Sequence, residues 1–269
     1  MKYMTFNSSC SYAGVANMLA QYGVETDDRT IARKMMLPYL FAKEDGAYLS
    51  GPMLQSADWF NLYLHPIGYH MVENRVEREQ IPSALRSTKT AMLGLRISPK
   101  SKHAVVYLGT DHSNFCFLNN KWQHTDEPEQ LSLTEVELLS RLDDDVMIAV
   151  LEPTQCKAVD FAPLFKQSIQ TLDELKQDIL SFCTQEQTPQ AIMTAMNKLF
   201  RAILLDGITM LELCAETAQA EKLRIVQSEF MIAVKKNTTV ILSEEISVDL
   251  LVEAIEEYKR LIERHSTRS

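Results

Sequence analysis

A cysteine, a histidine and an asparagine follow one another along the chain in an order that could support nucleophilic catalysis. Cys10 stands in NSSCSYAGVANMLAQYG, where a polar run gives way to a helical apolar pattern. A thiol at the start of a helix lies at the positive end of the helix dipole, which favours its thiolate. His103 opens the apolar strand pattern HAVVYLG, and the next strand pattern, NFCFLNN, ends in two amides. Because a thiol nucleophile needs a histidine as base and a third group to hold that histidine, the set predicts acyl transfer.

Either of two neighbouring amides could hold His103. A short turn would pair the two strands and bring the head of the first near the tail of the second, beside Asn119 and Asn120. Strand alternation puts these two side chains on opposite faces, so only one of them could reach the imidazole. We predict Asn119, because Phe115 and Phe117 share its face and would lead directly to a shielded amide.

These residues resemble those of the papain-like cysteine peptidases, including the bacterial branch that processes double-glycine leader peptides. In that family the nucleophile opens a helix near the N-terminus, and the histidine begins a strand in an HAV or HFV context. An Asn or Asp ends the following strand. The segment HAVVYLGTDHSNFCFLNNKW is similar in its HAV opening and in its closing Asn-x-Trp, and the resemblance covers residues 5–152.

The resemblance implies a role for each residue of the set. Cys10 would be the nucleophile, and His103 would be the base that also protonates the leaving group. Asn119 would orient the imidazole. Asn120 is the alternative, because the Asn-x-Trp match would use Trp122 to cover that amide.

One position departs from the family pattern. The family places a Gln six residues before the cysteine, where it donates a hydrogen bond to the oxyanion, and this chain has Met4 there. Asn7, three residues before Cys10, is the nearest amide that could act as oxyanion donor beside the Cys10 backbone N–H. Loss of such a donor costs roughly 10²- to 10³-fold in rate in a related chemistry.

The elements that must position these residues fall in the first part of the chain. Helical patterns come first, at residues 11–21, 29–36 and 53–64, and short strand patterns follow from Tyr69 onward. This order predicts an α+β domain with an antiparallel sheet, and the resemblance implies that it is a papain-like domain. The stretch LPYLFAKEDGAYLSGPMLQSADWFNLYL between two of these helices is either a wall of the substrate cleft or core packing plus a surface loop.

The second part of the chain differs in composition and in hydrophobic periodicity. All but one of the glycines and both tryptophans precede residue 150, and the remainder shows helical periodicity throughout. We therefore predict two domains, 1–153 and 160–269, of which the second is an all-α helical bundle and a candidate surface for protein contact. Thr188 and Pro189 open one of its helices as N-cap and first residue, Gly207 closes that helix, and the next runs over residues 208–236.

Composition limits the partners that the chain could take. It has 269 residues, 46% of them hydrophobic, and a formal net charge of −9 that is spread along the sequence. Nothing resembles the basic stripe that nucleic acid or an anionic membrane surface requires, so we expect neither partner. The sequence has no signal-peptide core and no apolar run of membrane-spanning length, which predicts a cytoplasmic protein.

The five cysteines are scattered and include no CxxC pair, so neither a disulfide framework nor a zinc site is predicted, and we expect no cofactor. The substrate would be a peptide or a small amide. With water as acceptor the protein is a peptidase or amidase, and with an amine it is an acyltransferase or amide synthase. A third hypothesis is a regulatory homologue that binds without catalysis, because Met4 replaces the oxyanion donor.

Overall fold

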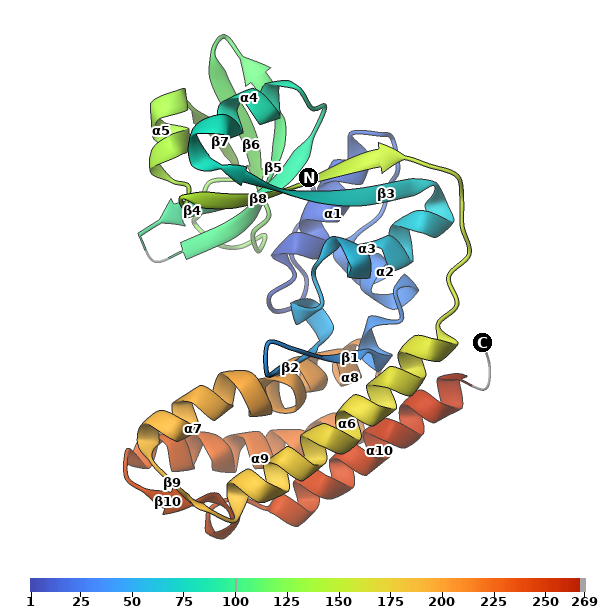
Figure 1. The fold of residues 1–269 in the computed structure, drawn as a ribbon, viewed down its shortest axis with the longest axis vertical. Coiled ribbons are helices and arrows are strands. Elements are labelled where there is room, and N and C mark those ends of the chain that lie inside the picture. The colour runs from blue at the N-terminus through green and yellow to red at the C-terminus, as the bar shows by residue number, and fades with distance from the viewer. Residues whose placement is uncertain (100, 267–269) are drawn as a thin grey trace. The chain divides into compact units, whose positions relative to one another are not determined.

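The chain combines helices with a central antiparallel sheet (Figure 1). The computed structural model describes residues 1–99 and 101–266. The described chain divides into two compact units. The first consists of Met1–Met35 and Gln55–Val159, and the second consists of Met36–Leu54 together with the chain from Asp160 onward. Among the described helices, none has both the length and the apolar character needed to cross a bilayer.

The first unit begins with helices and continues with strands, as the sequence patterns predicted. Its helices are α1 (Cys10–Ala20), α2 (Asp28–Lys34), α3 (Ala57–Leu64), α4 (Ile81–Arg86) and α5 (Glu135–Ser140), with 3₁₀ turns at His65–Ile67 and Arg78–Gln80. Its strands are β3 (Tyr69–Glu77), β4 (Ala91–Ser98), β5 (Ser101–Asp111), β6 (Asn114–Asn119), β7 (Gln130–Leu133) and β8 (Asp145–Pro153).

These strands form one sheet in the order β3-β8-β4-β5-β6-β7, and every neighbouring pair is antiparallel. The predicted pairing of the two strands that carry the histidine and the amides is confirmed, because β5 and β6 are joined by a tight turn. In this pairing Val105 lies opposite Asn119. His103, two residues before Val105, is therefore a diagonal neighbour of Asn119 on the same face of the sheet.

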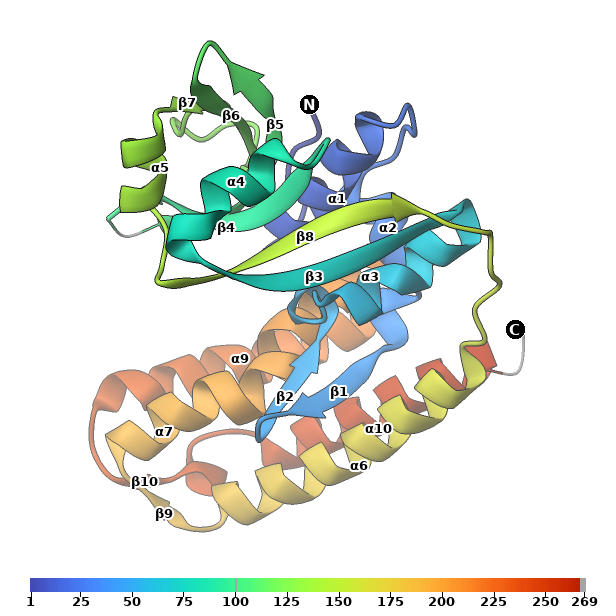
Figure 2. The same ribbon diagram turned by 45° about the horizontal axis from the view of Figure 1, so that its top comes forward.

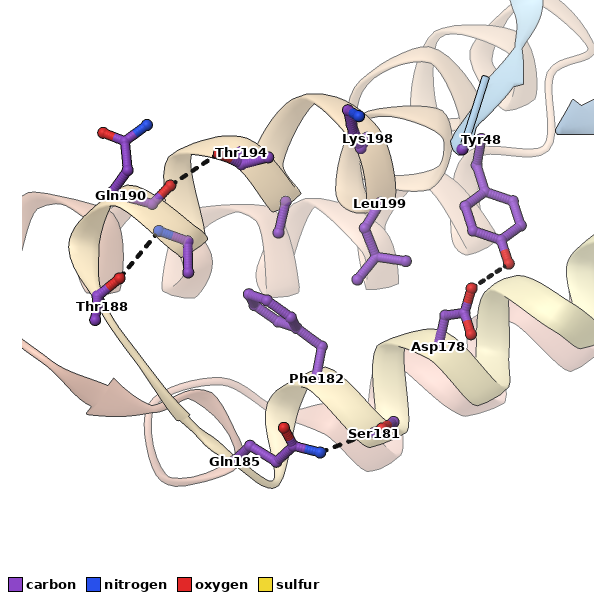
Figure 3. A pocket seen from close by; sticks show the side chains of 13 residues that line it. Tyr48, Asp178, Ser181, Phe182, Gln185, Thr188, Gln190, Thr194, Lys198 and Leu199 are labelled. Atoms are coloured by element: carbon purple, nitrogen blue, oxygen red, sulfur yellow. Dashed lines mark hydrogen bonds between the residues drawn. The ribbon is translucent and has the colours of Figure 1, made fainter. Parts of the chain in front are cut away.

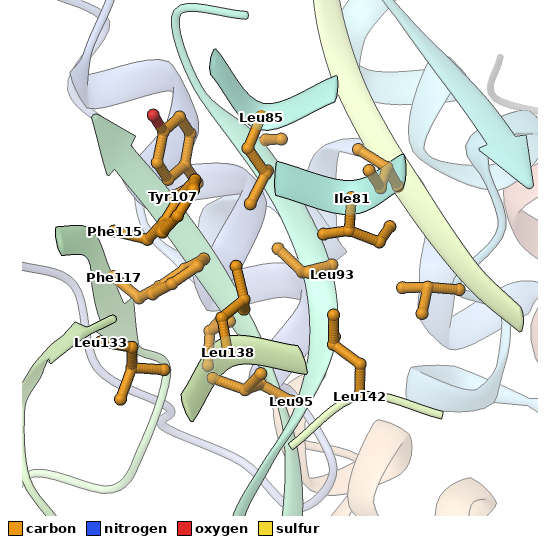
Figure 4. Packing of buried hydrophobic residues seen from close by; sticks show 14 of the residues in the cluster. Ile81, Leu85, Leu93, Leu95, Tyr107, Phe115, Phe117, Leu133, Leu138 and Leu142 are labelled. Atoms are coloured by element: carbon orange, nitrogen blue, oxygen red, sulfur yellow. The ribbon is translucent and has the colours of Figure 1, made fainter. Parts of the chain in front are cut away.

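One hydrophobic cluster of the first unit lies on the face of this sheet that α4 and α5 cover. Side chains from alternate positions of the strands pack against α4 and α5 (Figure 4), and the cluster includes Leu93, Leu95, Val105, Tyr107, Phe115, Phe117, Ile81, Leu85 and Leu138. Phe115 and Phe117 are fully buried, as is Asn119 at the end of the same alternating row. The buried apolar row along β6 therefore ends at the buried amide of Asn119.

The second unit is built mainly of helices but is not purely helical, which differs from the all-α domain expected from the sequence. Its helices are α6 (Ala162–Cys183), α7 (Pro189–Ala195), π-helical turns at Met196–Phe200 and Ala202–Gly207, α8 (Ile208–Leu213), α9 (Thr217–Lys236) and α10 (Val248–Ser266), with 3₁₀ turns at Leu37–Tyr39, Gly51–Met53 and Leu242–Glu244. It also contains two antiparallel two-stranded ladders, β1 (Phe41–Glu44) with β2 (Ala47–Ser50), and β9 (Glu186–Gln187) with β10 (Val240–Ile241).

The hairpin β1-β2 belongs with the helices of the second unit, although sequence analysis had placed its residues in the first domain. Figure 2 shows β1 beside α6, and β2 contacts the π-helical turns at Met196–Phe200 and Ala202–Gly207. The Phe41 N–H donates to Ser168 Oγ at 2.9 Å, and Ser50 Oγ donates to the Ala202 carbonyl at 2.6 Å. Phe41 also packs edge-on against Tyr258, with ring centroids 5.0 Å apart. The segment Met36–Leu54 is therefore part of the helical unit's core.

The cap predicted at Thr188 and Pro189 is confirmed, since the Thr188 side chain accepts from the Ala191 N–H at 3.2 Å. Gly207, which was expected to close this helix, instead lies inside a helical run that continues to Leu213. Its φ is helical, and a Cβ at this position would come within 3.0 Å of the Ala202 carbonyl oxygen. The glycine thus accommodates the wider π-helical turn.

Limited proteolysis should cut the exposed connector between Pro153 and Phe161 without separating the products. The N-terminal product retains Met36–Leu54, whose buried side chains and hydrogen bonds lie within the helical unit. We expect two bands on a denaturing gel and one peak on size exclusion in native buffer. Elution of two separate, folded fragments would contradict the assignment of this segment to the helical core.

Candidate active site

A cavity of about 290 Å³ in the first unit contains two of the residues that the sequence singled out. Both Cys10 and His103 line it. The remaining lining residues are Ser11, Gln55, Glu73, Met92, Leu93, Gly94, Lys102, Ala104, Met147 and Ala149. Its wall thus combines apolar side chains with polar and charged ones.

Cys10 is the first residue of α1, and the segment before it is clamped by one carboxylate. Asp28 is fully buried and accepts hydrogen bonds from the Thr5 N–H at 2.7 Å and from Ser9 Oγ at 2.8 Å. The clamp fixes where the chain turns into the helix. Cys10 is partly exposed to the cavity, and its backbone N–H is among the first of the helix, which have no acceptor within the helix itself.

Helix α1 can approach the sheet closely because Gly14 has no side chain. A Cβ at Gly14 would lie 2.4 Å from Met92 Sδ and 2.7 Å from Asn120 Nδ2. Asn120 in turn donates to the Ala104 carbonyl at 2.8 Å and accepts from Asn17 Nδ2 at 2.9 Å. The Asn120 amide therefore ties α1 to strand β5, and both its oxygen and its nitrogen are used for that purpose.

His103 is held by Asn119. The imidazole Nδ1 lies 2.9 Å from Asn119 Oδ1, and Asn119 Nδ2 donates to the Pro128 carbonyl at 3.0 Å. Because the amide nitrogen is turned toward Pro128, the amide oxygen faces the ring and accepts from Nδ1–H. In the neutral ring with this tautomer, the proton-free nitrogen is Nε2, which can act as a base.

Glu127 joins this pair, a contact for which the sequence offered no signal. Its Oε2 lies 3.4 Å from His103 Nδ1 and 3.4 Å from Asn119 Nδ2, and Ser101 Oγ donates to its Oε1 at 3.3 Å. A carboxylate at this position stabilises a positive charge on the imidazole. Glu127 reaches the ring from the loop between β6 and β7, so the contact depends on the tertiary fold.

The two remaining positions singled out in the sequence lie away from the cavity's lining. Met4 is buried and pairs with Trp122, its N–H donating to the Lys121 carbonyl at 2.9 Å. Asn7 is exposed in the turn before α1 and is not among the residues that line the cavity. The amide that does line it beside Cys10 is Gln55, which sequence reasoning missed.

Cys10 and His103 share the cavity without a hydrogen bond between them in the described part of the chain. Such contacts are often long in an unliganded site and shorten when substrate binds. The assignment of catalytic roles to Cys10, His103 and Asn119 stays a prediction. Within the described residues, no group of three histidine, cysteine or carboxylate side chains converges in a way that could hold a metal ion.

A larger cavity of about 690 Å³ lies in the second unit, between β2 and the helices α6 and α7 (Figure 3). Several of its polar side chains already serve the local fold. Tyr48 donates to Asp178 at 2.6 Å, Thr188 caps α7, and Thr194 Oγ1 donates to the Gln190 carbonyl at 3.0 Å. Phe182 and Leu199 supply its apolar surface. Among the described residues that line it, there is no cysteine or histidine.

Comparison with known proteins gives one low-scoring structural similarity to report. No protein-family model matches the chain, and no curated protein matches it. Among solved structures, it is similar to the peptidase domain of Streptococcus ComA, a bifunctional ABC transporter involved in a quorum-sensing pathway. The two chains are 10% identical with a TM-score of 0.38, over 56% of this chain and 96% of the other.

Proposed function

We propose that the chain is a cysteine-dependent acyl-transfer enzyme of papain-like type that cleaves the amide bond of a peptide or small amide. The observation that carries the proposal is the hydrogen bond from His103 to Asn119, next to a cavity that Cys10 lines from the start of a helix. Nucleophile, base and orienter are the parts that thiol acyl transfer requires.

The reaction follows from the proton positions. With Nδ1–H donated to Asn119, His103 Nε2 takes the Cys10 proton, and the thiolate sulfur bonds to the substrate carbonyl carbon. The tetrahedral oxyanion collapses, the C–N bond breaks, and His103 returns the proton to the leaving amine. Water, deprotonated by the same nitrogen, then cleaves the thioester and restores the Cys10 thiol. Glu127 stabilises the imidazolium while it exists.

Alkylation with iodoacetamide near neutral pH tests the proposal directly. We expect Cys10 to react at least about tenfold faster than the exposed Cys156, because His103 lines the same cavity and can take the thiol proton. Cys183 should stay unmodified, since burial raises the pKa of its thiol to about 12. Peptide mass spectrometry over a time course measures the rate at each cysteine.

The matched control is His103→Ala, which should bring the Cys10 rate down to that of Cys156. If Cys10 in the wild type reacts no faster than Cys156, or if removal of His103 leaves its rate unchanged, the thiol and the imidazole do not act together and the proposed enzyme is excluded.

A second candidate function, a binding protein without catalysis, is favoured by one observation. Met4 occupies the position of the expected oxyanion donor, and its side chain has no polar hydrogen. Turnover of an activated acyl donor such as acetyl-glycine 4-nitrophenyl ester distinguishes the two functions. The enzyme should release nitrophenol catalytically, whereas a binding protein would at most acylate Cys10 once.

A further inference from the structure

We infer that Gln55 donates the oxyanion hydrogen bond that Met4 cannot supply, an inference that rests on the proposed acyl transfer. Gln55 lines the cavity together with Cys10 and His103, yet it lies 45 positions after Cys10 in the sequence. It lies two residues before the start of α3, in the first unit, so its backbone belongs to the same unit as the nucleophile.

The Gln55 amide is tied to the first turn of α1. Ser11 Oγ donates to Gln55 Oε1 at 2.8 Å, and Ser11 is the residue directly after Cys10. This bond uses the amide oxygen and leaves both hydrogens of Nε2 for another acceptor. Among the described residues, none accepts from that nitrogen.

An oxyanion on a carbonyl attacked by Cys10 would meet two donors of different origin. One is the Cys10 backbone N–H at the start of α1, which has no hydrogen-bond acceptor within the helix. The other is Gln55 Nε2. A neutral amide suits this task, because it stabilises the oxyanion without forming an ion pair with the thiolate in the resting enzyme.

The other polar groups near the thiol are already used or point elsewhere. Ser11 Oγ donates its proton to Gln55, and Lys102 Nζ is held by Asp143 at 2.5 Å. Asn7 lies in an exposed turn and does not line the cavity. Gln55 is thus the amide with both the position and a free donor.

The test separates attack on a carbonyl from simple thiol reactivity. Acetyl-glycinal forms a hemithioacetal with an active thiol and needs an oxyanion donor, whereas iodoacetamide is attacked at a saturated carbon and needs none. Protection of Cys10 by acetyl-glycinal against iodoacetamide gives the aldehyde's affinity, and the unprotected rate gives thiol reactivity. Both readouts use the full chain and require no natural substrate.

Two variants remove the donor in different ways. Gln55→Glu keeps an acceptor for Ser11 Oγ but loses the N–H, and Gln55→Leu is neutral and of similar size. We expect both to weaken acetyl-glycinal binding by roughly 10²-fold or more while the alkylation rate of Cys10 stays within about threefold. Gln80→Glu, an exposed residue outside the cavity, is the matched control and should change neither readout.

Each other outcome has a definite meaning. Unchanged aldehyde affinity in both variants, with normal alkylation, overturns the role of Gln55 and leaves the proposed enzyme intact. Loss of alkylation together with aldehyde binding in both variants would show that Gln55 holds α1 in place, which also overturns a donor role. An unreactive Cys10 in the wild type removes the proposed function and this inference with it.

Discussion

Replacing Cys10 with alanine should abolish turnover of acetyl-glycine 4-nitrophenyl ester, by roughly 10⁴-fold or more, and leave the protein folded. Without the sulfur there is no covalent intermediate, and His103 has no proton to take. The side chain is only partly buried at the first position of α1, so its truncation removes little packing. We expect the free energy of unfolding to change by less than about 1 kcal/mol. Ester turnover and urea denaturation measure the two effects.

Cys156→Ala is the matched control for this substitution. Cys156 is exposed in the connector after β8, and its removal should affect neither turnover nor stability. Full turnover in Cys10→Ala would show that another group is the nucleophile. Unfolding of Cys10→Ala would instead show that the thiol is a packing residue of the helix start.

The second large effect should come from Asn119. We expect Asn119→Ala to lower ester turnover by one to two orders of magnitude, because the imidazole loses the acceptor that fixes its tautomer and ring orientation. Glu127, 3.4 Å from the same ring nitrogen, can still accept from Nδ1–H and should preserve part of the activity. The double variant Asn119→Ala/Glu127→Ala should therefore lose more than the product of the two single effects, a coupling that a double-mutant cycle measures.

Asn120→Ala provides the comparison. Its amide bonds to Asn17 and to the Ala104 carbonyl and is fully buried. Removing it takes one hydrogen-bond partner from each of those two groups, so the cost should fall on stability, at roughly 1–3 kcal/mol, with turnover of the folded protein changed only a few-fold. The reverse ranking of turnover would transfer the orienting role to Asn120 and restore the Asn-x-Trp alignment.

Local patterns in the sequence predicted those features that depend on near neighbours. Helix α1 starts within one residue of the expected position, because the apolar periodicity begins after the serines. Strand alternation placed Asn119 on the face of Phe115 and Phe117, and that face also carries His103. The alternation of side chains between two faces is a property of the strand itself, so it holds whatever the strand packs against.

Contacts between distant segments could not be predicted in the same way. Gln55 and Glu127 reach the cavity and the imidazole from loops, and nothing in the residues beside them marks that destination. The hairpin β1-β2 was missed for a different reason. Asp45 and Gly46 both have positive φ, as its tight turn requires, so the Asp-Gly signal was present in the sequence. The prediction of a long connection over these residues overlooks it.

At Gly207 a local signal was used, but it predicted the wrong structure. A glycine after an apolar run usually marks the end of a helix, but here it allows the helix to widen and continue. The deciding contact is the approach of the Ala202 carbonyl, which belongs to the π-helical turn and has no counterpart in the local sequence pattern. The prediction therefore ends a helix at Gly207, whereas the helical run continues to Leu213.

The membership of Met36–Leu54 in the helical unit has a consequence for how the protein is made on the ribosome. The hairpin is synthesised early, but the helices against which it packs begin only at Ala162. At synthesis rates of roughly 5–20 residues per second, its apolar side chains wait on the order of ten seconds for their partners. During that interval Phe41 and its neighbours are exposed on the nascent chain. Chaperone binding during translation should therefore be concentrated on this segment, well before the helical unit emerges.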